Sequence, residues 1–179
     1  MATIITDGRP PGASAPGTRI DAFLRNASAS SNMGVNGSSV AVPFFFLPDQ
    51  TRRCELNRIL FSIRDNGASG PDEFGAIANG ISTGITLKVL DSGDNVIHDF
   101  LDGETITTNG GFADFCYDVD NMGQGLTGDD IYAVRWTFAA AGKAVTFAPG
   151  LGQRLEITIA DDLSSLVWFK ALVQGFYVG

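Results

Sequence analysis

The segment RLEITI at positions 154–159 gives the clearest indication of the fold class, because apolar and polar residues alternate in it without interruption. Leu155, Ile157 and Ile159 share one side, and charged or polar residues occupy the other. A period of two places successive side chains on opposite faces of a β-strand. A strand with one buried and one solvated face is typical of an antiparallel sheet.

Similar alternation recurs along the chain after residue 40, between turn signals such as DSGDN at 91–95. No segment has the period of an amphipathic helix. The predicted strands are 41–46, 54–64, 85–90, 96–101, 115–119, 131–139, 144–147, 155–160 and 168–178. Nine short strands without crossover helices predict an all-β protein, an antiparallel β-sandwich, and at this strand count a jelly-roll-like one.

Two of these segments carry additional information. In CELNRILFSIR at 54–64 the alternation slips, which predicts a β-bulge near Asn57 and Arg58. The last segment, 168–178, is apolar on both faces. It is expected either to be a central strand or to lie in a subunit interface.

The 179 residues are enough for one domain with a core of its own. Composition changes near residue 40, since the first part is rich in Gly, Ala, Ser, Pro and Asn and contains one aromatic residue, Phe23. We therefore predict an extended N-terminal arm over 1–40 and a β-sandwich domain over 41–179. Such an arm is either a tail without a role or a segment that orders on a partner.

Charge is distributed unevenly along the chain. Residues 1–64 contain seven arginines and four acidic residues, a balance of +3, whereas the remainder contains 5 basic and 16 acidic residues, a balance of −11. The total of −8 argues against binding to nucleic acid, which depends on clustered basic residues. A dipolar chain of this kind favours docking of its N-terminal side on an acidic protein surface. The simpler reading is that Arg52, Arg53 and Arg58 line strand faces.

Several sequence features of membrane proteins, metalloproteins and enzymes are not found, which limits the possible classes of function. The first eleven residues lack the features of a secretory leader, and no apolar run is long enough to span a membrane, so we expect no membrane partner. The two cysteines, Cys54 and Cys116, do not have metal-binding or disulfide-rich spacing, and reduced thiols are expected. His98, the only histidine, lies within a predicted strand, and no nucleophile turn accompanies it. We predict that the protein is not an enzyme and has no cofactor.

Two motifs near residue 120 resemble ligand-binding loops, but each can also be explained as an ordinary loop. GQGLTG at 123–128 matches a dinucleotide fingerprint, but the following segment is a predicted strand instead of a helix, so we interpret it as a loop. Asp118, Asp120 and Asp129 match calcium-loop positions, while Met122 offers calcium no side-chain oxygen. A looser calcium site on these aspartates is a minor alternative to solvated loop acids, and no metal is predicted.

Paired carboxylates and aromatic residues are compatible with sugar chemistry without indicating it. The carboxylates occur in two groups, one formed by Asp99, Asp102 and Glu104 and the other by Asp161 and Asp162. Trp168, Phe169 and Tyr177 are candidates for a sugar platform, although aromatic residues in alternating strands more often belong to the core.

Three blocks carry a resemblance to a known class of proteins. They are RILFSIRDNG at 58–67, GITLKVLDSGDNVIHDFLDGETITTNGGFADFCYDVD at 84–120 and RLEITIADDLSSLVWFKALVQGFYV at 154–178. They resemble small β-rich structural proteins of tailed-bacteriophage virions. Within that class, jelly-roll cement or decoration proteins, which bind the outside of the head as trimers with an N-terminal arm, fit the arm and the predicted sandwich.

The resemblance implies a function and a set of contacts. The protein is expected to bind the major capsid protein on the outer head surface after synthesis in the host cytoplasm, to form a homotrimer and to stabilise the shell. Arm residues expected to contact the capsid are Arg9, Arg19, Phe23 and Arg25. Residues expected to pack the sandwich or the subunit interface are Phe44, Phe45, Phe46, Trp168, Phe169, Phe176 and Tyr177. The alternatives are a carbohydrate- or receptor-binding module of a virion and a neck or tail-ring protein.

Overall fold

The computed structural model describes residues 18–24, 35–64, 81–107, 118–124, 130–138, 145–164, 166 and 168–178, and only the backbone of 118–124 and 130–134. Ten strands and no helix occur in these ranges. The same ranges contain no helix that is long and apolar enough to cross a membrane.

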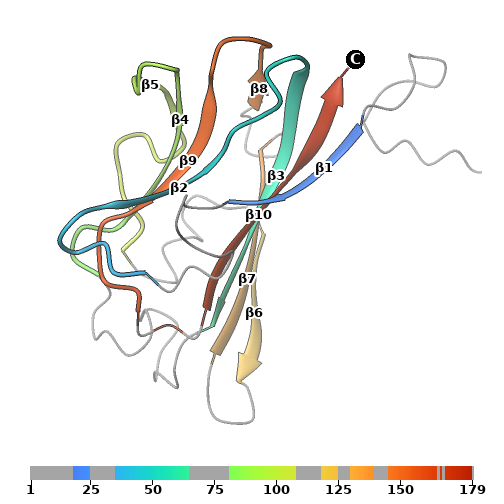
Figure 1. Cartoon of the computed structure of the whole chain (residues 1–179). Coiled ribbons are helices and arrows are strands. Elements are labelled where there is room, and N and C mark those ends of the chain that lie inside the picture. The colour runs from blue at the N-terminus through green and yellow to red at the C-terminus, as the bar shows by residue number, and fades with distance from the viewer. Residues whose placement is uncertain are drawn as a thin grey trace, which may run out of the picture.

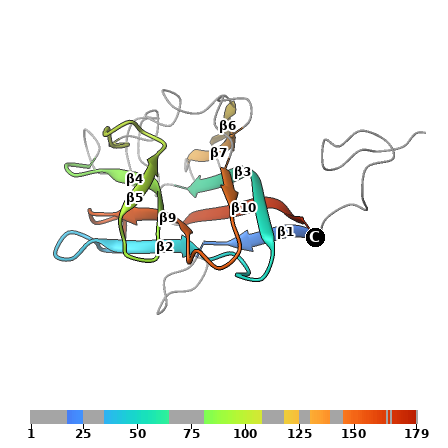
Figure 2. The same ribbon diagram turned by 90° about the horizontal axis from the view of Figure 1, so that it is seen from above.

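The strands form two sheets. The six-stranded sheet has the order β1 (Thr18–Phe23), β10 (Trp168–Val178), β3 (Arg53–Arg64), β7 (Asp130–Thr137) and β6 (Asp118–Gln124), and β8 (Val145–Phe147) also pairs with β3. The four-stranded sheet has the order β2 (Val42–Phe46), β9 (Arg154–Ile159), β4 (Ile85–Leu90) and β5 (Val96–Asp99). Every pairing is antiparallel. The two sheets lie on opposite sides of the molecule (Figures 1 and 2). The predicted antiparallel β-sandwich is therefore confirmed, and its jelly-roll form stays a prediction.

The core lies between the sheets and follows the alternation of the sequence. Leu155, Ile157 and Ile159 of β9 are fully buried, as their pattern predicted. Aromatic residues fill another part of the core. The ring centroids of Trp136 and Phe138 lie 5.6 and 5.0 Å from the ring centroid of Phe100. Full burial of such side chains stabilises the fold by about 2 kcal/mol each.

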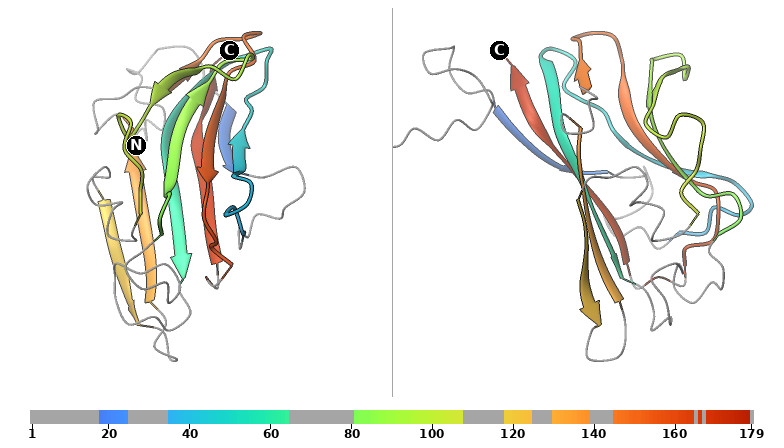
Figure 3. Two further views of the ribbon diagram at one scale, coloured as in Figure 1. Left: turned by 90° about the vertical axis from the view of Figure 1, so that its left-hand side faces the viewer. Right: turned by 180° about the vertical axis from the view of Figure 1, so that it is seen from behind.

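β10 is an interior strand of the larger sheet, hydrogen-bonded to β1 on one side and to β3 on the other, as the face-on view in Figure 3 shows. Phe169, Ala171 and Val173 are fully buried on its inner face. Its outer residues are half-buried. Of the two roles predicted for segment 168–178, the structure shows that of a central strand.

The predicted bulge in β3 is confirmed at Asn57. Gln174 pairs with Arg58 and the next residue, Gly175, pairs with Leu56, so Asn57 is the extra residue. The carbonyl oxygen of Asn57 accepts a hydrogen bond of 3.0 Å from the amide of Phe138. Residues 54–56 of β3, before the bulge, pair with β8, and residues 58–64, after it, pair with β7.

The packed body begins earlier than the predicted boundary at residue 40. β1 lies within the predicted arm and pairs along its whole length with β10. Ile20 and Leu24 are buried on the inner side of this segment, with Ala22 packed against the core between them. Residues 35–37 also join the body, because the amide of Gly37 donates a 2.7 Å hydrogen bond to the carbonyl of Asp161. The overall Gly, Ala and Ser content conceals this short alternating stretch.

The strand near residue 120 also differs from its prediction. β6 spans 118–124, whereas the predicted strand was 115–119 and residues 123–124 were interpreted as loop. β6 pairs with β7 from Asp118 opposite Arg135 to Gln124 opposite Asp130. Backbone pairing of this kind does not need an alternating apolar pattern, which the sequence DVDNMGQ lacks.

Candidate functional site: a cationic sheet face

The outer face of the six-stranded sheet collects much of the positive charge of the protein. Residues there alternate with the buried core residues of β1, β3, β7 and β10. Six of the twelve basic residues lie on it: Arg19, Arg53, Arg58, Arg64, Arg135 and Lys170. Among the described side chains, the acidic residues on this face are Asp21 and Glu55. We call this surface, defined by the six basic residues, the cationic face.

The charge of the cationic face is opposite to that of the whole chain. The register of β6 places Asp118 and Asp120 opposite Arg135 and Ala133, on the same side of the sheet. With them the face has six basic and four acidic residues, which sum to +2, while the other six basic and sixteen acidic residues of the sequence sum to −10. A positive surface on an acidic body steers the molecule toward a negatively charged partner and orients it on arrival.

A row of apolar side chains crosses the middle of this face. Phe23 of β1 pairs with Leu172 of β10, which pairs with Leu60 of β3. Phe23 is 41% exposed, and the two leucines are half-buried. We call these three residues the apolar row. Cross-strand neighbours are about 5 Å apart, so the row is continuous.

Trp168 lies on the same face and is covered by cations. The guanidinium carbon of Arg64 is 5.0 Å, and Nζ of Lys170 is 4.6 Å, from the centre of the indole. The indole N–H donates a 3.1 Å hydrogen bond to the hydroxyl of Ser62. Because two cations already lie over the ring, Trp168 does not offer the bare flat surface on which a sugar would stack.

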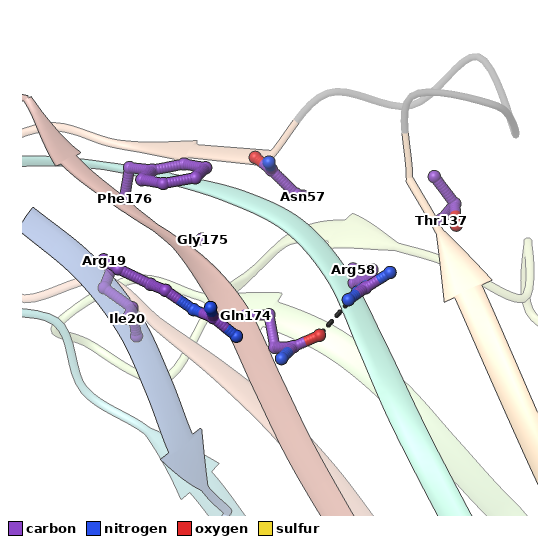
Figure 4. A pocket seen from close by; sticks show the side chains of 8 residues that line it. All are labelled: Arg19, Ile20, Asn57, Arg58, Thr137, Gln174, Gly175 and Phe176. Carbon is purple, nitrogen blue, oxygen red and sulfur yellow. Dashed lines mark hydrogen bonds between the residues drawn. The ribbon is translucent and has the colours of Figure 1, made fainter. Parts of the chain in front are cut away.

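A hollow of about 480 Å³ opens on the cationic face beside the β3 bulge. Its lining includes Arg19, Arg58, Gln174, Phe176 and Thr137, and Figure 4 shows Gln174 between the two arginines. β10 and β3 approach closely here, since a Cβ atom on Gly175 would overlap the carbonyl of Glu55.

Hydrogen bonds connect the charged groups of this hollow in a chain. Nε of Arg58 donates to the side-chain oxygen of Gln174, whose amide nitrogen donates to Asp21 at 2.6 Å. Asp21 in turn forms an ion pair with Arg19 at 2.6 Å. The hydrogen bond from Gln174, followed by the contact with Arg19, lowers the pKa of Asp21 below its ordinary value. Asp21 is therefore ionised at neutral pH and fixes the orientation of the Gln174 amide.

The structure places the predicted contact residues in different parts of the molecule. Arg19 and Phe23 lie on the cationic face in β1, and Arg9 and Arg25 are outside the described residues. Phe44, Phe46 and Phe169 are buried in the core of one chain, so they pack the sandwich and are not accessible to a second subunit. Of the two roles expected for these residues, the structure shows packing of the sandwich, because an apolar strand residue on the inner face is covered by the opposite sheet. Phe45, Trp168, Phe176 and Tyr177 are half-buried.

Tyr177 has a structural contact of its own. Its hydroxyl accepts a 2.8 Å hydrogen bond from the amide of Asp49, and the guanidinium of Arg52 lies 4.1 Å from its ring centre. The residue thus ties the end of β10 to the segment that connects β2 and β3. Whether it also contacts a second subunit stays a prediction.

The candidate metal ligands are only partly described. Asp118 and Asp120 lie in β6, opposite Arg135 and Ala133 of β7, and Asp129 is outside the described residues. The part of the chain that the structure describes contains no group of three side chains suited to a metal ion.

The remaining catalytic candidates have other partners. His98 is half-buried in β5, with its ring edge-on to Phe100 at 4.6 Å between centroids. Asp99 caps the amide of Leu101 at 3.0 Å and faces Nζ of Lys88 at 3.6 Å. Burial raises the pKa of the Cys54 thiol to about 12, which leaves it protonated and unreactive at neutral pH.

The Asp161 and Asp162 pair is divided between two roles. Asp161 is 8% exposed and accepts hydrogen bonds from Ser82, Thr83 and Gly84. Asp162 is half-buried and accepts a 2.8 Å hydrogen bond from the side chain of Asn36. Both carboxylates therefore stabilise the connections between strands.

Sequence reasoning missed the central residues of the cationic face. Leu60, Leu172, Arg135 and Lys170 were not predicted as contacts, although each alternates with a buried neighbour. Arg53 and Arg58 line a strand face, as the simpler reading of the sequence had it. The described arrangement is suited to adhesion through charge and apolar contact. No family model, curated protein or solved structure matches this sequence.

Proposed function

We propose that this protein is a non-enzymatic structural protein that adheres to an acidic protein surface through the cationic face. The observation that supports the proposal is the charge of +2 on this face of a chain whose total is −8. Self-association through the same face is disfavoured because like charges would meet. A partner with clustered aspartates and glutamates complements it.

The apolar row supports a protein as the partner. Stable protein interfaces have an apolar centre surrounded by a polar rim. On the cationic face, Phe23, Leu172 and Leu60 occupy the centre, with basic residues on either side. Phe23 and the arginines belong to the residue types that contribute most at such centres.

We further propose the setting that the sequence resemblance implies. In it the protein decorates the outer head surface of a tailed bacteriophage, binds the major capsid protein there and acts as a homotrimer. A protein that binds only the assembled shell stabilises it by mass action. Three copies of a moderate contact add avidity when the capsid geometry lets all of them bind at once.

The test is binding to purified heads of the phage that encodes the protein. The Arg64→Gln/Arg135→Gln variant removes two charges from the cationic face, and Lys88→Gln/Arg154→Gln removes two from the outer side of the other sheet. We expect the first variant to bind about tenfold more weakly at moderate salt and the second to bind as the parent does. Equal binding by both variants would refute the role of the face.

The contribution of the arm needs a separate deletion. Removal of residues 1–16 takes away Arg9 and leaves β1 in the sheet, whereas removal of 1–35 would also take away β1 and expose β10. We expect the shorter deletion to remain folded and to lose avidity for heads. Unchanged binding would restrict the contact to the cationic face.

A further inference from the structure

We infer that the hollow beside the β3 bulge is the point at which the cationic face binds the side-chain carboxylate of a glutamate or aspartate from its partner. This inference rests on the proposed function and names the chemical group that the face recognises. It is carried by the shape of the hollow, its charge balance and the donors of Arg58.

The bulge creates the hollow. Because Asn57 is an extra residue, β3 bends and leaves β7 at Thr137, and the next stretch of β3 pairs with β8. Opposite the bulge stands Gly175, where a side chain would collide with the backbone of β3. The hollow thus follows from backbone geometry that the fold maintains without a ligand.

The charges inside the hollow leave room for one negative group. Arg19 and Arg58 line the hollow with two positive charges, and Asp21, next to it and paired with Arg19, contributes one negative charge, a balance of +1. A single carboxylate neutralises this balance. A phosphate dianion would exceed it and would approach Asp21, so a carboxylate is the better match.

Arg58 has the donors that such a ligand needs. Its Nε is engaged by Gln174, and the orientation of the Gln174 amide is set in turn by Asp21. Among the described residues, no hydrogen bond involves the two terminal nitrogens of Arg58. A guanidinium held through Nε presents these nitrogens in a fixed plane, which suits a two-point contact with a carboxylate.

The residues that line the hollow favour a carboxylate attached to a short chain of methylene groups. Phe176 forms one wall of the hollow and Thr137 lies on the opposite side, as Figure 4 shows. The ring accommodates the methylene groups of a glutamate, and the hydroxyl of Thr137 is available as a further donor. The neighbouring apolar row would contact the flanking residues of the partner.

The experiment is an NMR titration of the full chain at 150 mM salt with the blocked tripeptide acetyl-Leu-Glu-Leu-amide, whose only charge is the glutamate carboxylate. The matched probe is the same peptide with glutamine. We expect saturable shifts at the Gln174 side chain and the Gly175 amide with the first peptide only. Inorganic phosphate serves as a third probe and should not compete.

Three variants make the result specific to the hollow. Arg58→Gln should weaken peptide binding about tenfold or more, and Arg58→Lys, which retains the charge and loses the planar fork, should show an intermediate loss. Lys88→Gln removes one charge from the outer side of the other sheet and should leave the affinity within about twofold. Amide spectra of each variant verify that the fold is intact.

Several outcomes would overturn the inference: no saturable shift, equal shifts with the glutamine peptide, displacement by phosphate, or equal losses in Arg58→Gln and Lys88→Gln. Its failure is distinguishable from failure of the proposed function. Head binding that still depends on Arg64 and Arg135 would retain the cationic face and reject only the hollow. Head binding insensitive to those arginines would reject the face itself.

Discussion

Asp161 offers the sharpest test of how the sandwich is held together, through the substitution Asp161→Asn. Its carboxylate accepts hydrogen bonds from the amides of Ser82, Thr83 and Gly84 at 3.2, 2.9 and 2.6 Å, and from the Ser82 hydroxyl at 2.9 Å. These bonds attach the segment before β4 to the end of β9. The side chain is nearly inaccessible, so water cannot replace the lost partners.

The expected loss follows from the donors that an asparagine cannot satisfy. An asparagine has one acceptor oxygen, and its NH₂ group would face amides that are themselves donors. If the oxygen stays with one pair of donors, at least two charge-assisted hydrogen bonds are lost. At about 1.5 kcal/mol each, the lower end for charged groups, the free energy of unfolding falls by about 3 kcal/mol. For a chain of this length that corresponds to a decrease in Tm of about 6–12 °C.

The assay is urea unfolding at pH 7, followed by circular dichroism, with Asp162→Asn as the matched control. Asp162 is more exposed and accepts fewer hydrogen bonds, so its variant should lose less than about 1 kcal/mol. A loss below 1 kcal/mol for Asp161→Asn, or equal losses for the two variants, would refute the reasoning.

The same pair of proteins gives a pH dependence with a definite sign. Burial alone would raise the pKa of Asp161, but the hydrogen bonds from Gly84, Ser82 and Thr83 outweigh it and lower the pKa below its ordinary value. The folded state therefore prefers the ionised form. Its stabilisation is fully present above about pH 4 and is lost as the pH falls through the lowered pKa. The difference in stability between the parent and Asp161→Asn should shrink over that acidic range, whereas a constant difference would contradict this origin.

Two further predictions concern the interior. Gly175→Ala should lower the free energy of unfolding by more than about 3 kcal/mol, because its Cβ would overlap the carbonyl of Glu55. Gly150→Ala, in open space at positive φ, should lower it by about 1 kcal/mol. Urea titrations in which Gly175→Ala is not the more destabilising variant would contradict the close approach of β10 and β3. In a Cys116→Ser background, Cys54 should react with a thiol reagent only after denaturant is added, because burial raises its pKa to about 12; reaction of the native protein at neutral pH would disprove this.

The strands with clean alternation could be predicted from the sequence. β4 and β9 lie within one residue of their predicted limits, because a strand with one buried and one solvated side must alternate. The bulge at Asn57 was predictable for the same reason, since an extra residue shifts the phase of the pattern. β1 and β6 were not, because the first is a short stretch inside a polar, flexible composition and the second has no apolar period.

The order of residues along the chain is enough to predict that the protein is all-β, that one face of most strands is buried, and that positive charge is concentrated before residue 65. Which residues share a surface depends on the pairing of the strands. Phe23, Leu60 and Leu172 are far apart in the chain, and they become neighbours because β1, β10 and β3 pair in one register. Alternation specifies the face of a residue within its strand, while the identity and offset of the neighbouring strand depend on long-range hydrogen bonds and packing that no local pattern records.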